Sequence, residues 1–207
     1  MEVPYEGIVS RYLNRRLSRP MARWLARTPV TPNQVSLASF AMALASLGFF
    51  VVGQNVWAGL AAQASSIVDG ADGDLARLKG RTTAFGGFFD AVLDRYADVA
   101  ILAGMAFWSL TFEAKGPPWL ALGVSLLAIV GALMVSYTRA RAEASLGVAF
   151  SGPVGFLATR DARLLLVMIG ALLGQALATL MVLALFTNGT VLWRVALVRR
   201  LSVKERR

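Results

Sequence analysis

The sequence predicts an all-α integral membrane protein with six transmembrane helices, preceded by an amphipathic helix that lies in the membrane interface. Of its 207 residues, 57% are hydrophobic, and the mean hydropathy is +0.60. This composition is too apolar for the surface of an ordinary globular domain. Apolar runs recur along the chain, and they come close to the length that is needed to cross a bilayer, about 20 residues. We therefore expect an interfacial segment at 1–30, a six-helix domain at 31–200 and a basic tail at 201–207.

The first helix and the first span have distinct sequence signatures. Residues 5–28 mix Arg with Ile, Leu, Met and Trp at roughly helical spacing, which is typical of a helix in the membrane interface. Pro20 should kink this helix or split it in two. The run TPNQ at 31–34 then predicts a helix start, with Thr as N-cap, Pro at the first helical position and Gln completing a capping box. The first span follows and is expected to end near Gly53.

The other five spans are separated by polar, glycine-containing or proline-containing turns and by one longer loop at 145–159. Two or three of the six spans are expected to have polar ends that lie inside the protein. The expected bounds of these spans are about 56–79, 84–110 and 118–144, with the fifth span beginning near 160 and the sixth near 176.

The basic residues predict the orientation of these spans. Positive charge concentrates in the N-terminal helix, at 77–81, at 139–163 and in the tail after 194, whereas the opposite connections carry only Lys115. Loops rich in Lys and Arg stay on the cytoplasmic side of a membrane. We therefore expect a multi-pass protein of the cell (inner) membrane, with both termini and the acidic cluster described below on the cytoplasmic side.

Composition also excludes several kinds of chemistry. The chain has no cysteine and no histidine, which excludes disulfides, thiolate nucleophiles, imidazole bases and the commonest zinc sites. The net charge of +9 comes from basic residues that lie between the apolar spans. We therefore expect these residues to face the anionic surface of the membrane, and we expect no nucleic acid as a partner. Metal binding and proton transfer must fall mainly to carboxylates, which prefer hard cations.

Four aspartates are the candidate metal ligands. Asp69 and Asp72 lie about 60° apart on one predicted helix, and Asp90 and Asp94 about 40° apart on the next. Because a short turn joins the two helices, we expect them to be antiparallel neighbours whose carboxylates converge at the cytoplasmic end. Converging carboxylates repel one another unless cations compensate. Such a site could hold two divalent ions, Mg²⁺ or Mn²⁺, an arrangement used for displacement at phosphorus.

Two further aspartates are expected outside this cluster. Asp74 lies about 140° round the helix from Asp69 and is interpreted as a solvated or Arg-paired surface residue. Asp98 is one turn deeper than Asp94, where an unpaired charge is costly. We expect Asp98 to be structural and to have a buried partner, with Arg139 or Arg141 as the candidates.

The glycines and Arg77 allow two interpretations. Four glycines lie in the two helices although glycine is a poor helix former in water: Gly70, Gly73, Gly86 and Gly87. Because they have no side chains, they could leave space for a ligand to approach the backbone. They could equally serve close helix packing. Arg77 could hold a phosphate or could be a positively charged anchor on the cytoplasmic side.

The motif DGADGDLAR, eight residues, then GGFFDAVLD, over residues 69–94, resembles the signature of the CDP-alcohol phosphotransferases. Every defined position of the pattern D-x2-D-G-x2-A-R-x8-G-x3-D-x3-D is present. The six expected spans and the Thr-Pro-Asn start of the first span are also similar to that family. The resemblance implies a membrane enzyme that transfers a phospho-alcohol from a CDP-alcohol donor to an acceptor hydroxyl and releases CMP.

The resemblance also implies residue roles. The four candidate ligands would hold two divalent metals, and Asp94 would also be the catalytic base. This agrees with the absence of histidine, since a carboxylate is then the most available base. The residues implied to lie against the CDP moiety are Asp69, Gly73, Ala76, Arg77 and Gly86. A homodimer is expected from the family and from no residue pattern of this chain.

Four arginines are candidates for binding a phosphorylated polyol acceptor. Arg139 and Arg141 end the expected fourth span, and Arg160 and Arg163 share a face at the start of the fifth, near a helix N-terminus that favours anions. Their positions also fit the positive-inside rule alone. The runs SYTRARAEAS and ATRDARLLL resemble the branch whose acceptor is an inositol phosphate, and most closely the synthases that join CDP-inositol to inositol 1-phosphate. Phosphatidylinositol phosphate synthases, which use CDP-diacylglycerol, remain the alternative.

Other classes of function are compatible with some of these features. Carboxylates inside a membrane also mark ion paths, so a divalent-cation transporter is an alternative. Against it, the acidic residues cluster at one end of the spans and no polar series leads to the other side. A scaffold with a charged rim would not explain the ordered spacing of the aspartates.

Overall fold

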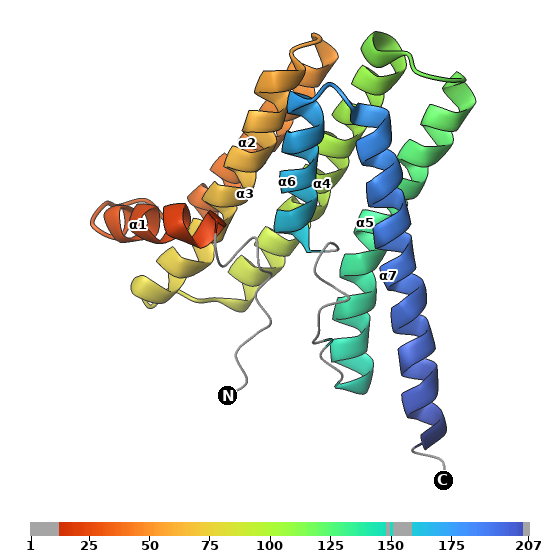
Figure 1. Ribbon diagram of the computed structural model, residues 1–207. Coiled ribbons are helices and arrows are strands. Elements are labelled where there is room, and N and C mark those ends of the chain that lie inside the picture. Colours follow the sequence, from red (N-terminus) through yellow and green to blue (C-terminus); the bar gives the residue numbers. More distant parts are fainter. Residues whose placement is uncertain (1–12, 148–149, 151–158, 205–207) are drawn as a thin grey trace.

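The computed structural model describes residues 13–147, 150 and 159–204, and every regular element in these parts of the chain is helical. The long helices run side by side in a bundle, and α1 projects from one side of the bundle, where it packs against α3 (Figure 1). The predicted helices are all present, with bounds close to those expected. The elements are α1 (Arg15–Leu25), α2 (Pro32–Val51), α3 (Asn55–Leu78), α4 (Ala84–Trp108), the π-helical turn η2 (Ser109–Glu113), α5 (Pro118–Leu146), α6 (Arg160–Leu172) and α7 (Ala176–Lys204).

Three helices are long and apolar enough to cross a membrane: α2, α5 and α7 over Ala176–Arg200. They correspond to the expected first, fourth and sixth spans. The expected second, third and fifth spans coincide with α3, α4 and α6. The predicted loop at 145–159 falls mostly outside the described residues, although α5 already extends to Leu146.

Helix starts follow the predicted capping chemistry. The Thr31 side chain accepts a hydrogen bond from the Gln34 backbone N–H, and the Gln34 side chain accepts one from the Thr31 N–H, so the capping box is complete. Thr83 caps α4 by a single bond, because its side chain accepts a hydrogen bond from the Gly86 backbone N–H. In the N-terminal helix the described part, Arg15–Leu25, runs through Pro20 without a break, so the helix is not split there. The rest of the segment predicted at 5–28 before residue 13 lies outside the described residues.

The end of α4 differs from the prediction. The helix continues as the π-helical turn η2 to Glu113, where a turn was expected. This extension brings the Glu113 carboxylate to the N-terminus of α7, where it accepts a hydrogen bond from the Leu177 backbone N–H at 2.8 Å. A carboxylate at that position satisfies a free amide and complements the helix dipole.

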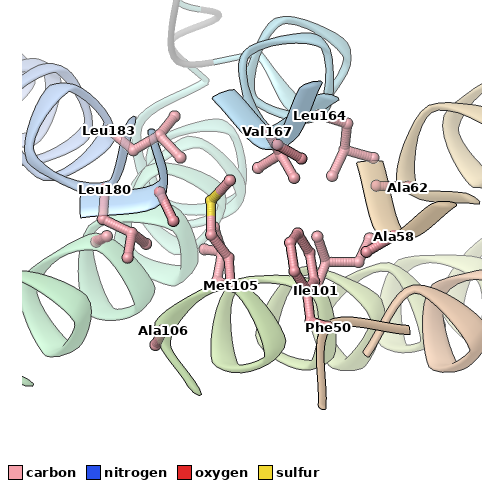
Figure 2. Packing of buried hydrophobic residues seen from close by; sticks show 14 of the residues in the cluster. Phe50, Ala58, Ala62, Ile101, Met105, Ala106, Leu164, Val167, Leu180 and Leu183 are labelled. Atoms are coloured by element: carbon pink, nitrogen blue, oxygen red, sulfur yellow. The ribbon is translucent and has the colours of Figure 1, made fainter. Parts of the chain in front are cut away.

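The core consists of large side chains from several helices set against alanines. Phe50, Ile101 and Met105 meet Leu164 and Leu180 in its centre (Figure 2). Small residues let the helices approach closely in other places, which is typical of membrane helix packing.

One packing expectation is wrong. α3 and α4 were expected to pack as antiparallel neighbours, but α2 packs extensively against both and they touch each other only sparingly. Gly104 of α4 explains part of this arrangement, because a Cβ there would lie 3.0 Å from the Leu47 Cα of α2. The turn at 80–83 therefore joins two helices that are held together mainly through α2.

Candidate metal centre

Three of the four predicted metal ligands meet at one place. Carboxylate oxygens of Asp69 and Asp72 on α3 and of Asp90 on α4 lie within 4.8 Å of one another. Asp72 is buried, and the buried Oδ1 of Asp90 has no hydrogen-bond partner among the described residues. An unsatisfied carboxylate oxygen in such a cluster is costly without a cation. The donor set therefore fits a hard divalent cation.

Two serines of α2, which were not among the predicted site residues, hold these carboxylates. The Ser36 hydroxyl donates to Asp72 Oδ2, and the Ser39 hydroxyl donates to Asp69 Oδ1 at 3.3 Å. Both serines are buried. Two serines at i, i+3 in an otherwise apolar span were the available signal. They orient the acidic side chains from the helix that packs between α3 and α4.

Asp94 faces a guanidinium group instead of the three-carboxylate group. Arg160 at the start of α6 has Nη1 2.5 Å from Asp69 Oδ2 and 3.0 Å from Asp94 Oδ1. Its Nε lies 3.5 Å from Asp98 Oδ1. Asp69 therefore belongs to two groups, one with Asp72 and Asp90 and the other with Asp94 and Arg160.

Asp98 is buried and paired, as expected, but its predicted partner is wrong. The carboxylate pairs with Arg163, whose Nη2 lies 2.5 Å from Oδ2, and with Arg160. Arg139 is instead paired with Glu143 at 2.9 Å. The reason is packing, because the N-terminus of α6, and not the end of α5, reaches this depth of α4.

Asp74 lies outside the cluster and is paired with arginines, which confirms the prediction for this residue. Its carboxylate accepts hydrogen bonds from Arg15 of α1 at 2.7 Å and from Arg77 at 2.5 Å. The pair with Arg15 ties α1 to α3. The pair with Arg77 is more exposed and keeps that guanidinium at the edge of the neighbouring pocket.

A pocket of about 200 Å³ opens beside Asp72 and Asp90. Four of the five residues predicted to contact a CDP group line it, and Asp69 does not. Lining residues that the prediction missed come from the start of α2, from the turn before α4 and from the first turn of α4. They are Pro32, Asn33, Ser36, Arg81, Thr82, Thr83 and Gly87, and the predicted ones are Gly73, Ala76, Arg77 and Gly86.

The glycines of this pocket differ in the space around them. A Cβ on Gly87 would meet nothing within 4 Å, and one on Gly73 would meet only the Arg77 guanidinium at 4.0 Å. A Cβ on Gly86 would lie 3.0 Å from Thr83 Oγ1. Gly73 and Gly87 are therefore not required for helix packing, and they keep the pocket wall open.

The four predicted acceptor arginines do not form one group. Arg160 and Arg163 face the acidic side chains described above. Arg141 lines a separate cavity of about 360 Å³ between α5 and α7, together with Phe150 and Arg194. Arg194, which the prediction missed, is buried, stacks on the Phe150 ring at 4.8 Å and donates to Thr138 Oγ1 at 3.1 Å.

The groups around the acidic cluster and its pocket suit one kind of ligand. Carboxylates that fit a divalent cation border a pocket whose other polar groups include two guanidinium groups, from Arg77 and Arg81, and the Thr82 and Thr83 hydroxyls. Such surroundings suit a ligand that carries phosphate and binds together with a metal. Fold and site thus fit one class: a helical membrane protein whose carboxylates and neighbouring pocket suit a divalent metal and a ligand that carries phosphate.

The family can be stated as well. Residues 29–198 match the family model described as CDP-alcohol phosphatidyltransferase. The match covers most of the chain and includes the aspartates, the pocket and all helices from α2 to α6. The protein belongs to the CDP-alcohol phosphatidyltransferase family.

Relatives within the family carry inositol-related names. The chain is 43% identical over 195 residues to a bifunctional IPC transferase and DIPP synthase of Rubrobacter xylanophilus, covering 94% of this chain and 43% of that protein. It thus spans less than half the length of that relative. It is 32% identical over 202 residues to a phosphatidylinositol phosphate synthase of Mycobacteroides abscessus, covering 97% of this chain and 86% of the relative.

A solved structure supports the same fold. The phosphatidylinositol phosphate synthase of Mycobacterium tuberculosis, crystallised with manganese and citrate, superposes with a TM-score of 0.74 and 28% sequence identity. The superposition covers 86% of this chain and 87% of that one. A crystal structure of the same synthase holds bound CDP-DAG.

Proposed function

We propose that this chain is a CDP-alcohol phosphotransferase. It moves a phospho-alcohol from a CDP-alcohol to the hydroxyl of an acceptor and releases CMP. The observation that carries the proposal is the carboxylate cluster of Asp69, Asp72 and Asp90 at the rim of a pocket with two arginines. Family membership supports this activity over the alternatives of a cation transporter or a charged scaffold.

The carboxylates would hold two divalent cations, Mg²⁺ or Mn²⁺. Asp69, Asp72 and Asp90 form the preassembled group, and Asp94 would complete a second position with Asp69. When bound, the cations would neutralise the negative charge of the donor's pyrophosphate. The serine hydroxyls of Ser36 and Ser39 would keep the carboxylates oriented for this purpose.

In the reaction, the residues of the chain position two substrates and accept one proton. The CDP group would lie against Gly73, Ala76, Arg77 and Gly86, with Asp69 at its inner end. The acceptor oxygen forms a bond to the phosphorus that carries the donor alcohol, and the bond between that phosphorus and the CMP oxygen breaks. The proton of the acceptor hydroxyl passes to a carboxylate oxygen of Asp94, which acts as general base.

For the substrates, we favour CDP-inositol as donor and inositol 1-phosphate as acceptor. The similarity to a DIPP synthase over 94% of this chain supports this choice. The alternative donor is CDP-diacylglycerol, supported by the similarity to phosphatidylinositol phosphate synthases. Acceptor phosphate would be bound by Arg139, Arg141, Arg160 and Arg163, in two separate pairs, so the pair nearer the acidic cluster is the more direct candidate.

The topology is part of the same proposal. Six spans would be formed by α2 to α7, with α1 in the membrane interface, and the segments 1–30, 31–200 and 201–207 would be the interfacial part, the six-helix domain and a cytoplasmic tail. Three helices that are apolar enough to cross a membrane and the distribution of Lys and Arg support it. The termini and the site would face the cytoplasm at the inner membrane, surrounded by lipid, in a homodimer.

Release of CMP tests the activity. Purified protein in detergent would be incubated with CDP-inositol or CDP-diacylglycerol, each with inositol 1-phosphate, inositol or glycerol phosphate, and with Mg²⁺ or Mn²⁺. We expect metal-dependent CMP release with one donor and with inositol 1-phosphate, and none after addition of a chelator. A cooperative unfolding transition would show that the assayed protein is folded. If that folded protein released no CMP from any pair of substrates, the proposed activity would be contradicted.

A further inference from the structure

Arg160 occupies the position at which a second cation would be expected. Its Nη1 bridges Asp69 Oδ2 and Asp94 Oδ1, and its Nε approaches Asp98. We infer that the Arg160 guanidinium is a built-in cation of the Asp69–Asp94 position and that a divalent metal binds there only by displacing it. This inference rests on the metal site proposed above and adds an order of events to it.

The acidic cluster is asymmetric in a way that favours this order. Asp69, Asp72 and Asp90 already present oxygens within 4.8 Å of one another, and Arg160 contacts only the first of them. A first metal could therefore bind without moving Arg160. At the second position, the guanidinium lies between the two carboxylates that a metal would need.

Charge balance points in the same direction. The cluster holds five carboxylates and two arginines, of which Arg163 is buried and Arg160 is 12% exposed. Their formal charge is −3 when all are ionised: Asp69, Asp72, Asp90, Asp94, Asp98, Arg160 and Arg163. One divalent cation would bring this charge to −1, and two would bring it to +1 with both arginines in place. Loss of Arg160 from the cluster restores neutrality, which a buried site favours.

The contacts of the Arg160 guanidinium are compatible with its displacement from the carboxylates by a metal ion. All three guanidinium nitrogens are buried, yet none makes a hydrogen bond of regular geometry to a described residue. The three ion pairs of the guanidinium therefore lack the regular bidentate hydrogen-bond geometry that makes Arg–carboxylate pairs strongest. A more highly charged cation at the same carboxylates would compete effectively.

The backbone beside Arg160 is held independently of its side chain. Asp161 accepts hydrogen bonds from Asn14 at 2.7 Å and from Ser66 at 2.8 Å. Arg163 is paired with Asp98, and Thr159 caps the helix. The guanidinium can therefore leave the cluster while α6 stays in place. Once released, it becomes available to an anionic acceptor near the site, so metal loading would precede acceptor binding.

Mn²⁺ binding to the whole chain in detergent tests the inference without an activity assay. Electron paramagnetic resonance measures free Mn²⁺ during a titration. We expect wild type to show one tight and one weaker site. Arg160→Gln should tighten the weaker site by about tenfold or more and change the tight site less, because a competing positive charge is removed. The matched control is Arg95→Gln. The Arg95 guanidinium lies 3.5 Å from Asp94 Oδ2, but it is partly exposed and does not bridge the two carboxylates. Its effect on the weaker site should be much smaller.

The outcomes separate this inference from the proposed function. Absence of any Mn²⁺ binding to wild type would defeat the metal-dependent function itself. Two wild-type sites of equal affinity, an Arg160→Gln variant whose weaker site is unchanged or weaker still, or an equal effect of Arg95→Gln would overturn the role of Arg160 and leave the function intact.

A second measurement uses the wild-type protein, so it does not depend on how well the variant folds. Phenylglyoxal modifies accessible guanidinium groups, and mass spectrometry locates the adducts. Arg160 is buried beside the carboxylates without metal, so its labelling should rise when Mn²⁺ is added. Labelling of Arg139, which is 54% exposed and paired with Glu143, is the internal reference and should stay constant. Unchanged or reduced Arg160 labelling at saturating Mn²⁺ would overturn the inference.

Discussion

The individual aspartates of the helix ends have three different environments, although the sequence presents them as one run. Asp69, Asp72 and Asp90 converge, Asp94 and Asp98 face arginines of α6, and Asp74 pairs with Arg15 and Arg77. Angular spacing on a helix predicts which side chains share a direction, and it correctly separated Asp74 from the cluster. It cannot predict which residue of a distant helix will lie opposite, and for Asp98 it led to the wrong partner.

Asp94→Asn tests the base assignment at the residue scale. The amide cannot accept the acceptor's proton, so turnover should fall by at least about 100-fold. Binding of the CDP-alcohol should remain measurable by calorimetry, because Asp94 does not line the pocket beside Asp72 and Asp90. Simultaneous loss of turnover and donor binding would show that Asp94 serves the site in another way.

Ser36→Ala tests the orientation of the metal ligands. Loss of its hydrogen bond to Asp72 should weaken Mn²⁺ binding at the tight site by about tenfold, as is typical for groups that hold metal ligands. Ser46→Ala is the matched control, since that serine is equally buried in α2 but donates to the Ala58 carbonyl. Equal effects of the two variants on metal affinity would indicate a general loss of packing.

At the scale of the helices, α1 is joined to the bundle by a buried polar network. Asn14, just before α1, donates to Ser66 of α3 and to Asp161 of α6 and accepts a hydrogen bond from Gln63. The sequence predicted an amphipathic helix here from its Arg and apolar residues, but this pattern carries no information on what the helix touches. The network links an expected interfacial helix directly to the residue next to Arg160.

Asn14→Ala should destabilise the protein through this network. Two buried side chains, Ser66 and Gln63, and the partly buried Asp161 carboxylate would lose a hydrogen bond, so the free energy of unfolding should fall by about 1–3 kcal/mol. Denaturant unfolding in detergent, followed by tryptophan fluorescence, measures the change. Thr111→Ala is the control, because that threonine is exposed and bonds only within its own helix. A loss no greater than the control would mean that the network does not anchor α1.

At the scale of the whole molecule, the arrangement of the helices concentrates function at one end. α1, the turn between α3 and α4 and the start of α6 meet there, whereas the connections after α2, η2 and α6 lie at the other end (Figure 1). The distribution of basic residues along the sequence had predicted the same division. Its orientation in a membrane is therefore open to a direct test.

The absence of cysteine makes that test simple. Glu143→Cys, at the end of α5 expected in the cytoplasm, and Lys115→Cys, on the opposite connection, each introduce a single exposed thiol. In inside-out vesicles, a membrane-impermeant maleimide should label the first and not the second, and right-side-out vesicles should give the reverse. Labelling of both from the same side would contradict an odd number of crossings between them.

Local sequence was enough to predict the helices, the capping box of α2, the turn between α3 and α4 and the placement of the aspartates on the two helix ends that this turn joins. These features depend on residues close together in the chain: hydrophobic runs, the TPNQ capping box and the period of a helix. Long-range packing, in contrast, sets α2 against both acidic helices and places two of its serines on their carboxylates. It alone brought Arg160 and Arg163 to the aspartates and left Arg139 and Arg141 elsewhere. Such contacts join residues distant in the sequence, and they follow from how side chains of different size fill the space between helices.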